Sequence, residues 1–293
     1  MDVVDGLIQT RALRVAPPGQ VFWYTSGTIG PYYINTHFLF GGVAAAEALL
    51  AFIDATSGDD VGFPAQLRRR VLDQLAADPV YNSAVAQLAD RVASLAPDGV
   101  DWISGGERRD WFFSVAVAER MQKPHLYLFK QANRAYVSER GQPGAVPVSG
   151  RRVAHVADLV TEASSYLRDW VPSIRRLGCR MDCSVNVVDR GQGGLATIEA
   201  SGVPVADALV RVDRALFAEL RRRGTIGADQ ESLLVAYQQD PHASMRAYMV
   251  DRPGFLAAAL ADPDPKTAAR ARLCVMQNLY GLDAAVLPGL PAA

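Results

Sequence analysis

Apolar and polar positions follow two alternating patterns along the middle of the chain. Short apolar runs rich in β-branched and aromatic residues indicate buried strands, and longer stretches with apolar residues every three to four positions indicate amphipathic helices. The predicted strands cover residues 100–103, 125–129, 153–156, 181–188 and 205–210, and the helices among them cover 111–121 and 164–177. Because strands that alternate with single helices require right-handed crossovers, we expect an α/β fold with a mostly parallel sheet flanked by helices.

Helical and turn-rich segments surround this alternating region. A short amphipathic helix at 4–13 precedes two β-rich segments, which a Ser-Gly-Thr-Ile-Gly turn joins. A polar stretch from Lys130 to Gly150 is long enough to form a mobile loop or lid. The β-rich segments lie at 21–27 and 31–40, and further helices are expected at 43–53, 66–77, 84–95 and throughout the tail after residue 213. We therefore predict an N-terminal hood (1–42), a helical insertion (43–97), an α/β core (98–212) and a helical C-terminal extension (213–293).

The composition excludes several classes of protein. With 293 residues, 49% of them hydrophobic and 21% charged, the chain has the composition of an ordinary globular protein. Its formal net charge of −1 creates no field that attracts nucleic acid or an anionic membrane, so any bound anion must be held locally. No stretch is long and apolar enough to span a bilayer and no secretory signal is recognisable, which predicts a cytoplasmic protein. The three cysteines match neither a zinc pattern nor a disulfide framework.

One segment combines the features of a ligand site: Val153-Ala-His-Val-Ala-Asp158-Leu-Val-Thr161-Glu-Ala-Ser-Ser165. It begins as a buried strand, places an acidic residue at the carboxyl end of that strand, and continues into a small-residue turn that opens a helix. Ligands bind at this edge of an open parallel sheet, where a helix N-terminus offers N–H groups to phosphate. Asp158 could instead cap the following helix turn, and the mid-strand His155 is interpreted as a buried, hydrogen-bonded core residue.

This segment resembles the ribose-phosphate signature of the type I phosphoribosyltransferases, in which two adjacent acids precede a Thr/Gly/Ser-rich loop. Four other segments, in the same order and at similar spacing over roughly residues 20–210, resemble parts of the orotate phosphoribosyltransferases. They are the hood (Phe22-Trp-Tyr-Thr-Ser-Gly27 with Pro31-Tyr-Tyr-Ile-Asn35), the pyrophosphate loop (Ser104-Gly-Gly-Glu-Arg-Arg-Asp110), the mobile loop (Lys130-Gln-Ala-Asn-Arg-Ala135) and a late strand end (Val188-Asp-Arg-Gly-Gln-Gly-Gly194).

The resemblance implies an enzyme that transfers a phosphoribosyl group from phosphoribosyl pyrophosphate to a pyrimidine base, orotate above all, and releases pyrophosphate. It also implies Mg²⁺ as cofactor and a homodimer, because the mobile loop of that family reaches the neighbouring active site. The implied catalytic residues are Asp158, at the ribose hydroxyls and near the metal's coordination shell, and Lys130, at the pyrophosphate. The implied binding residues contact the 5′-phosphate (Thr161, Ser164, Ser165), the pyrophosphate (Arg108, Arg109) and a carboxylate of the base (Arg190).

The chain departs from the family's pattern at several of these positions. Ala157 replaces the first of the two acids, and the phosphate loop holds Glu162 and Ala163 where the family has a small residue and glycine. Glu162 must face outward for the loop to bind phosphate, because two like charges ~4 Å apart cost about 4 kcal/mol at an effective dielectric of about 20. Ala163 costs on the order of 1–2 kcal/mol if its position requires a positive φ. Asn133 and Ala135 stand where the family's mobile loop has a lysine and a histidine.

These departures leave alternatives open for the whole protein and for single residues. The chain could be a binding or regulatory protein that keeps the fold without the reaction, or a phosphoribosyltransferase for another base. Arg108 and Arg109 could be solvated charges before a helix, and Arg190 could form an ion pair at its strand end. The glycines around Arg190 indicate a close approach of the backbone to a neighbouring group.

Overall fold

The structure is a computed structural model that describes residues 1–130, 134–144, 149–283 and 286–287. The chain divides into two compact units. Unit 1 comprises Met1–Leu13 with Asn35–Val212, and unit 2 comprises Arg14–Ile34 with Asp213–Ala293. The two units therefore share the N-terminal segment. The boundaries at residues 42, 97 and 212 expected from the sequence stay predictions.

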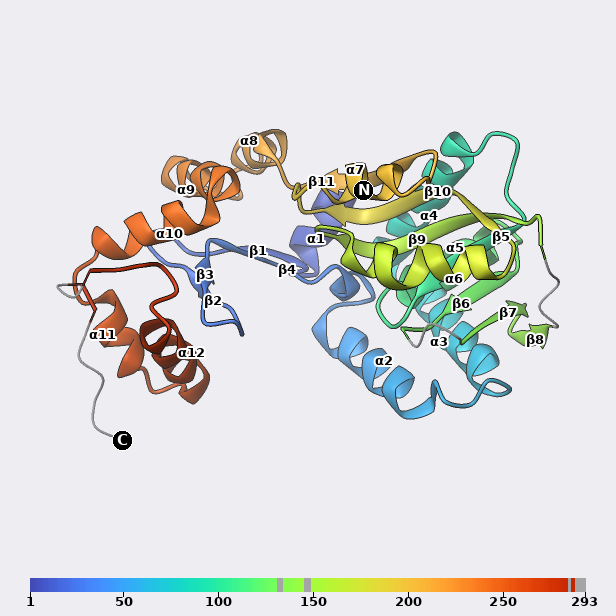
Figure 1. Ribbon diagram of the computed structural model, residues 1–293, viewed down its shortest axis with the longest axis horizontal. Helices are drawn as coiled ribbons and strands as arrows, with labels where there is room; N and C mark the ends of the chain where they lie inside the picture. Colours follow the sequence, from blue (N-terminus) through green and yellow to red (C-terminus); the bar gives the residue numbers. More distant parts are fainter. Residues whose placement is uncertain (131–133, 145–148, 284–285, 288–293) are drawn as a thin grey trace. The chain divides into compact units, whose positions relative to one another are not determined.

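A seven-stranded sheet forms the centre of unit 1, with the strand order β11-β10-β9-β5-β6-β7-β8 (Figure 1). From β11 to β6 all neighbours are parallel, whereas β7 and β8 are antiparallel to their neighbours. The expected mostly parallel sheet flanked by helices is thus confirmed. The strands are β5 (Trp102–Gly106), β6 (His125–Leu128), β7 (Ala135–Glu139), β8 (Gln142–Gly144), β9 (Arg152–Val160), β10 (Arg180–Asp189) and β11 (Ala206–Arg211).

Helices cover both faces of this sheet, with α6 on one face and α4 and α5 on the other (Figure 1). Helix α5 is buried at every position from Trp111 to Ala118, because α3 and α4 pack against its outer side. The helical elements of unit 1 are α1 (Val3–Gln9), η1 (Thr36–Leu39), α2 (Val43–Thr56), α3 (Phe63–Ala77), α4 (Pro79–Leu95), α5 (Trp111–Arg120), η2 (Tyr166–Trp170), α6 (Val171–Arg176) and α7 (Gly194–Ala200).

Unit 2 joins an N-terminal segment to the C-terminal helices. The backbone N–H of Ile29 donates to the hydroxyl of Tyr280 at 2.8 Å, and Gln230 Nε2 donates to the carbonyl of Ala16 at 2.7 Å. In the part of the chain that the structure describes, no helix is long and apolar enough to cross a membrane. The remaining elements are the paired strands β1 (Leu13–Val15) with β4 (Tyr32–Ile34) and β2 (Phe22–Trp23) with β3 (Ile29–Gly30), and the helices α8 (Arg214–Arg222), α9 (Ala228–Gln239), α10 (Pro241–Val250), α11 (Phe255–Leu260) and α12 (Pro265–Met276).

Several expectations about local structure are wrong. The first helix ends at Gln9, and residues 13–15 form a strand because β4 offers them a pairing partner. Residues 36–39 form a 3₁₀ helix instead of the end of a strand. The helix expected at 164–177 begins as a π-helical turn, η2, before α6.

The stretch Lys130–Gly150 is not a loop throughout, because β7 and β8 form a hairpin within it. Strand β7 pairs with the free edge of β6, which satisfies the backbone groups of both. Arg134 anchors the beginning of the hairpin through an ion pair with Asp60 and lies 3.9 Å from the centroid of the Phe129 ring. Asn133, at the position of the family's loop lysine, lies outside the described residues.

Candidate functional site

A cavity of about 380 Å³ opens in unit 1 beyond the carboxyl end of β5 and along the end of β9. The turn between β5 and α5 supplies residues 107–110, and the end of β9 with the turn after it supplies most of the remaining lining. Arg190 is not among the described residues that line the cavity. The other site residues predicted from the sequence all line it: Asp158, Thr161, Ser164, Ser165, Arg108, Arg109 and Lys130.

Asp158 lies inside β9, close to the end of the strand, and is buried. Thr36 Oγ1 donates a hydrogen bond to Asp158 Oδ2 at 3.0 Å, and the backbone N–H of Asp158 donates to Asp110 Oδ1 at 3.0 Å. Burial and the neighbouring Asp110 carboxylate raise the pKa of Asp158 to about 7, and the positive charge of Arg109 opposes this rise. The carboxyl group is therefore held rigidly and gains its charge near neutral pH.

The turn after β9 contributes Thr161, Ser164 and Ser165 to the lining of the cavity. Glu162 is exposed and is not part of the lining, so it satisfies the condition for phosphate binding that its charge imposes. Ala163 has a φ of +62°, in the left-handed region, and its side chain is buried in the core. This position therefore requires the conformation that favours the family's glycine, and alanine adopts it with strain.

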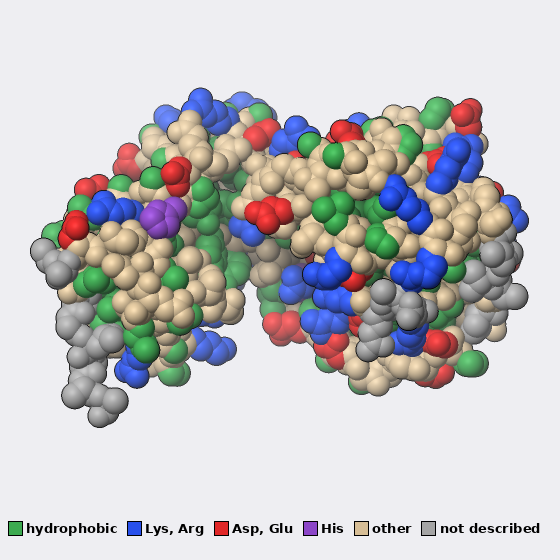
Figure 2. All heavy atoms as spheres, in the orientation of Figure 1, with side chains coloured by type: hydrophobic (Ala, Val, Ile, Leu, Met, Phe, Trp, Pro, Cys, Tyr) green, Lys and Arg blue, Asp and Glu red, His purple; other side chains and the backbone are tan. Residues whose placement is uncertain are grey.

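The turn after β5 carries the cationic side of the cavity. Arg108 forms an ion pair with Asp54 of α2, and Arg109 lies close enough to Asp158 to lower the pKa of that carboxyl group. Glu107 ties the turn to Lys130, whose backbone N–H donates to Glu107 Oε2 at 3.2 Å. On the face drawn in Figure 2, Lys and Arg side chains gather over unit 1 between the positions of α2 and α6. These cations suit an anionic ligand.

The glycines that precede this turn fit tightly among neighbouring side chains. A Cβ at Gly105 would clash with Ser114, and a Cβ at Gly106 would clash with the ring of Trp170. A positive φ is not the reason for glycine at these two positions, since both lie inside β5. The Ser-Gly-Gly sequence thus reflects close packing around the strand end that carries Arg108 and Arg109.

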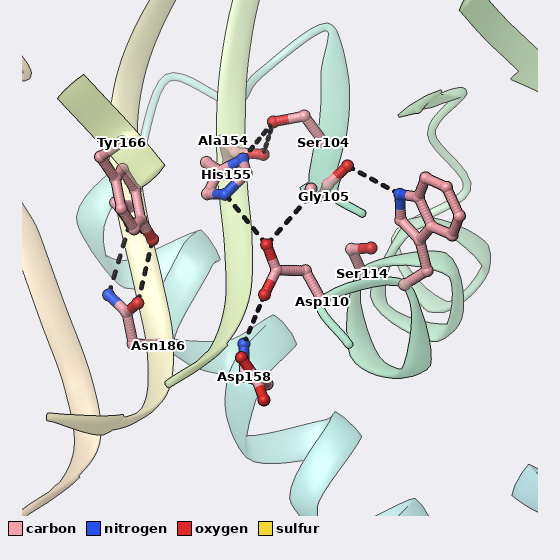
Figure 3. Close-up of polar contacts among 12 residues, drawn as sticks. Ser104, Gly105, Asp110, Ser114, Ala154, His155, Asp158, Tyr166 and Asn186 are labelled. Carbon is pink, nitrogen blue, oxygen red and sulfur yellow. Dashed lines mark hydrogen bonds and ion pairs between the residues drawn. The ribbon is translucent and has the colours of Figure 1, made fainter. Parts of the chain in front are cut away.

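Asp110 is a site residue that sequence reasoning missed (Figure 3). It is buried, lines the cavity, and accepts hydrogen bonds from the backbone N–H groups of Gly106 and Asp158, each at 3.0 Å. His155 Nε2 lies 3.6 Å from its Oδ2, and His155 Nδ1 lies 2.9 Å from Ser104 Oγ. The interpretation of His155 as a buried, hydrogen-bonded core residue is confirmed. In the sequence, Asp110 is only one more charge in a Glu-Arg-Arg-Asp run, and no local signal shows its partners.

Arg190 lies at the end of β10, where its backbone N–H donates to the carbonyl of Val160 at 3.0 Å. The glycines after it serve a contact within the protein. A Cβ at Gly194 would clash with the carbonyl oxygen of Thr161, and Gly193 has a φ of +84°. The close approach predicted around Arg190 therefore brings the start of α7 against the turn after β9. A contact between Arg190 and a base stays a prediction.

The described residues contain no group of three or more histidine, cysteine, aspartate or glutamate side chains that could hold a metal ion. Asp158 and Asp110 place two carboxyl groups beside the cavity, but both oxygens of Asp110 already accept backbone hydrogen bonds. Mg²⁺ commonly takes one or two carboxylates together with phosphate oxygens and water. This donor set fits Mg²⁺ only together with a polyphosphate ligand, with Asp158 as the protein's contribution.

Comparisons with known proteins point in one direction. No protein-family model matches the chain. An orotate phosphoribosyltransferase of Nocardioides sp. is 26% identical over 137 residues, which are 47% of this chain and 73% of the relative. An orotate phosphoribosyltransferase of Methanocella arvoryzae is 30% identical over 118 residues, which are 40% of this chain and 66% of the relative. The crystal structure of orotate phosphoribosyltransferase from Francisella tularensis superposes with a TM-score of 0.51 at 13% identity, over 80% of this chain and 96% of that one.

Proposed function

We propose that this chain, a distant homologue of the orotate phosphoribosyltransferases within the type I phosphoribosyltransferase family, transfers a phosphoribosyl group from phosphoribosyl pyrophosphate to a nitrogenous base. One observation carries the proposal: a single cavity combines Arg108, Arg109 and Lys130 on one side with Asp158 and a hydroxyl-bearing turn on the other. These groups match the pyrophosphate, the ribose and the 5′-phosphate of that substrate.

The proposed reaction breaks the bond between ribose C1′ and the pyrophosphate oxygen and forms a bond between C1′ and a nitrogen of the base. The electron pair of the broken bond leaves with pyrophosphate, and the base nitrogen loses its proton to solvent. Arg108, Arg109 and Lys130 stabilise the negative charge that grows on the leaving group, with donors already in place before the reaction. The protein's main contribution is therefore positioning and charge stabilisation.

Asp158 binds the ribose hydroxyls in this proposal, and it accepts their hydrogen bonds best when ionised. Its neighbours Thr36 and Asp110 fix its side chain and its backbone respectively. Mg²⁺, when bound, supplies positive charge to the pyrophosphate oxygens. Thr161, Ser164 and Ser165 would bind the 5′-phosphate through their hydroxyl groups. A homodimer and a cytoplasmic location stay part of the proposal by resemblance.

The base is proposed to be orotate, whose carboxylate a guanidinium group such as that of Arg190 would bind in a bidentate manner. One observation favours a second candidate: Arg190 is not among the described lining residues, which is compatible with a base that lacks a carboxylate. Screening orotate against uracil, adenine and hypoxanthine, with detection of nucleotide and pyrophosphate, distinguishes the two candidates.

Calorimetric titration with phosphoribosyl pyrophosphate plus Mg²⁺ tests the site directly. We expect a Kd on the order of micromolar for the wild type and a loss of at least about tenfold in Asp158→Asn, which keeps the shape and the bond to Thr36 but removes the charge. Glu162→Gln is the matched control, since its exposed charge lies outside the cavity and should change the Kd by less than about twofold. Absence of binding by the wild type at millimolar ligand would contradict the proposal. Binding without transfer to any base would leave a ligand-binding protein that lacks the reaction.

A further inference from the structure

The sheet of unit 1 splits between β5 and β9. The pairing of these two strands reaches only as far as Ser104 and His155. Beyond this point β5 continues to pair with β6 up to Gly106, and β9 continues to pair with β10 up to Val160. The two halves of the sheet therefore diverge at their carboxyl edge, which is where open α/β sheets bind ligands.

The carboxylate of Asp110 spans this split (Figure 3). Its Oδ2 accepts the N–H of Gly106 on β5, and its Oδ1 accepts the N–H of Asp158 on β9, both at 3.0 Å. These two bonds take the place of ladder bonds between the strands. Since a carboxylate is rigid and planar, its two oxygens set the distance between the strand ends.

Helix capping does not account for this aspartate. Asp110 occupies the N-cap position of α5, but its side chain makes no capping bond. An aspartate at this position ordinarily accepts a hydrogen bond from the second or third N–H of its own helix. Asp110 is only 8% exposed, so its charge is desolvated at a cost that these two strand contacts must offset.

The last paired residues of the two strands are Ser104 and His155, and they lie beside the Asp110 carboxylate within the sheet. The imidazole ring of His155 bonds to Ser104 Oγ through Nδ1 and lies 3.6 Å from Asp110 Oδ2 through Nε2. The ring of Trp170 stacks on the same imidazole with a centroid distance of 6.3 Å. The imidazole ring is therefore fixed beside the carboxylate by Ser104 and Trp170, although Nε2 is too far from Asp110 for a hydrogen bond.

We propose that Asp110 is a positioning residue which fixes the spacing between the two halves of the phosphoribosyl pyrophosphate site, a role that rests on the proposed function. Gly106 leads into the turn with Arg108 and Arg109, which form the pyrophosphate half, and Asp158 belongs to the ribose half. A ligand that spans both halves depends on this spacing. A ligand that occupies only the cationic half does not.

The test compares wild type with Asp110→Asn by calorimetry, using two probes with Mg²⁺: phosphoribosyl pyrophosphate, which spans the split, and inorganic pyrophosphate, which does not. The asparagine oxygen can accept, but its amide group only donates, so one of the two strand contacts is lost. The affinity for phosphoribosyl pyrophosphate should fall at least about tenfold. The affinity for pyrophosphate should stay within about twofold or increase, because a negative charge near the cations is removed. Equal loss for both probes, or no loss for the spanning probe, would overturn the proposal.

Asp101 offers a matched control at the opposite end of the same two strands. Its Oδ2 accepts the N–H of Arg152, the first residue of β9, at 2.8 Å. Asp101→Ala removes this contact, together with the ion pair to Arg151, next to the start of β5 and far along the strands from the cavity lining. It should change the affinity for either probe by less than about twofold. A tenfold loss in this control would mean that any weakening of the strand pair impairs binding, which contradicts a specific role for Asp110.

Amide hydrogen exchange separates this proposal from the proposed function. In Asp110→Asn, the amide that loses its acceptor, either that of Gly106 or that of Asp158, should exchange at least about tenfold faster relative to Val185 in the middle of β10. In Asp101→Ala the affected amide should be that of Arg152. If the wild type binds no phosphoribosyl pyrophosphate, the proposed function fails. The exchange rates of the Gly106 and Asp158 amides then still test whether Asp110 joins the two strands. Unchanged protection of Gly106 and Asp158 would then overturn the positioning role, and faster exchange would support it.

Discussion

Burial decides the charge of individual side chains around the cavity. Desolvation, with the Asp110 carboxylate, raises the pKa of Asp158 to about 7, and desolvation, with the charges of Arg109 and Arg108, lowers the pKa of His37 to about 4. The histidine ring packs against Phe112 with its plane nearly perpendicular. At neutral pH His37 is therefore uncharged, and it adds no positive charge to that of Arg108 and Arg109.

The lowered pKa of His37 makes the contribution of this residue to stability smaller in acid. The unfolded state binds this proton below pH ~6.5 and the folded state only near pH 4, so stability contributed by this residue falls as the pH falls through that window. Between pH 7.5 and pH 5 the loss should reach about 2 kcal/mol. His37→Gln should lose less stability than the wild type over the same interval in urea unfolding. His242→Gln, at an exposed position of α10, is the control and should behave as the wild type does. An equal loss in His37→Gln and wild type would contradict this assignment.

The strained backbone of Ala163 predicts an unusual response to glycine. Glycine relieves a left-handed conformation that costs alanine about 1–2 kcal/mol, but it also removes a buried methyl group worth about 0.8 kcal/mol. Glycine also gains freedom in the unfolded chain, worth about 0.4–1 kcal/mol, so Ala163→Gly should leave the free energy of unfolding within about 0.8 kcal/mol of the wild type. Ala196→Gly, at an exposed position inside α7, should lower it by about 1 kcal/mol. Equal destabilisation in both variants, measured by urea unfolding, would show that the φ of Ala163 is not strained.

At the scale of elements, the cavity is formed by turns that follow neighbouring strands of the sheet. The β5–α5 turn, the turn after β9 and the start of α7 converge at the carboxyl edge of the sheet. Gly194 permits the last of these contacts, since α7 begins against the backbone of Thr161. The position of the hydroxyl-bearing turn thus depends on a helix that does not itself line the cavity.

Two glycine substitutions separate packing from backbone strain at this contact. Gly194→Ala forces a methyl group against the Thr161 carbonyl, which should cost about 1–3 kcal/mol and move the turn that binds phosphate. Gly193→Ala meets no atom within 4 Å and has only the strain of a positive φ, about 1–2 kcal/mol. We expect both variants to have a lower melting temperature, but only Gly194→Ala to bind phosphoribosyl pyrophosphate more weakly, by at least about tenfold. Comparable affinities in both would contradict the role of this contact.

At the scale of the whole molecule, the two units are built from chain segments that alternate in the sequence. Unit 2 takes residues 14–34 from near the N-terminus and the helices after residue 213. Its cohesion depends on contacts such as that between Ile29 and Tyr280. The described residues that line the cavity, in contrast, all belong to unit 1.

Ligand binding should therefore stabilise the two units differently. Phosphoribosyl pyrophosphate plus Mg²⁺ at 100 times its Kd should raise the free energy of unfolding of unit 1 by about 2.7 kcal/mol. The slowest-exchanging amides of β9 and β10 should gain this protection, whereas those of α9 and α10 should not. Asp158→Asn at the same ligand concentration is the control and should gain less. Equal protection of both units would show that they unfold as one cooperative body.

The sequence by itself determined those features that depend on neighbours along the chain. The strands and helices of the α/β region, and the turn with Thr161, Ser164 and Ser165 after a buried strand, follow from local periodicity and from residue preferences that act over a few positions. The need for Glu162 to face outward follows from charge alone. These properties could be predicted because their causes lie within one or two turns of the chain.

Only the tertiary structure decided which distant residues meet. Asp110 and Asp158 are 48 positions apart, and Ile29 and Tyr280 are 251 apart. No local pattern indicates that Asp110 bonds across a split between β5 and β9, that β7 continues the sheet, or that residues 14–34 join the C-terminal helices. These features depend on long-range strand pairing and on the burial that results from it, because a buried carboxylate or a free strand edge acquires its partners only when the whole chain is packed.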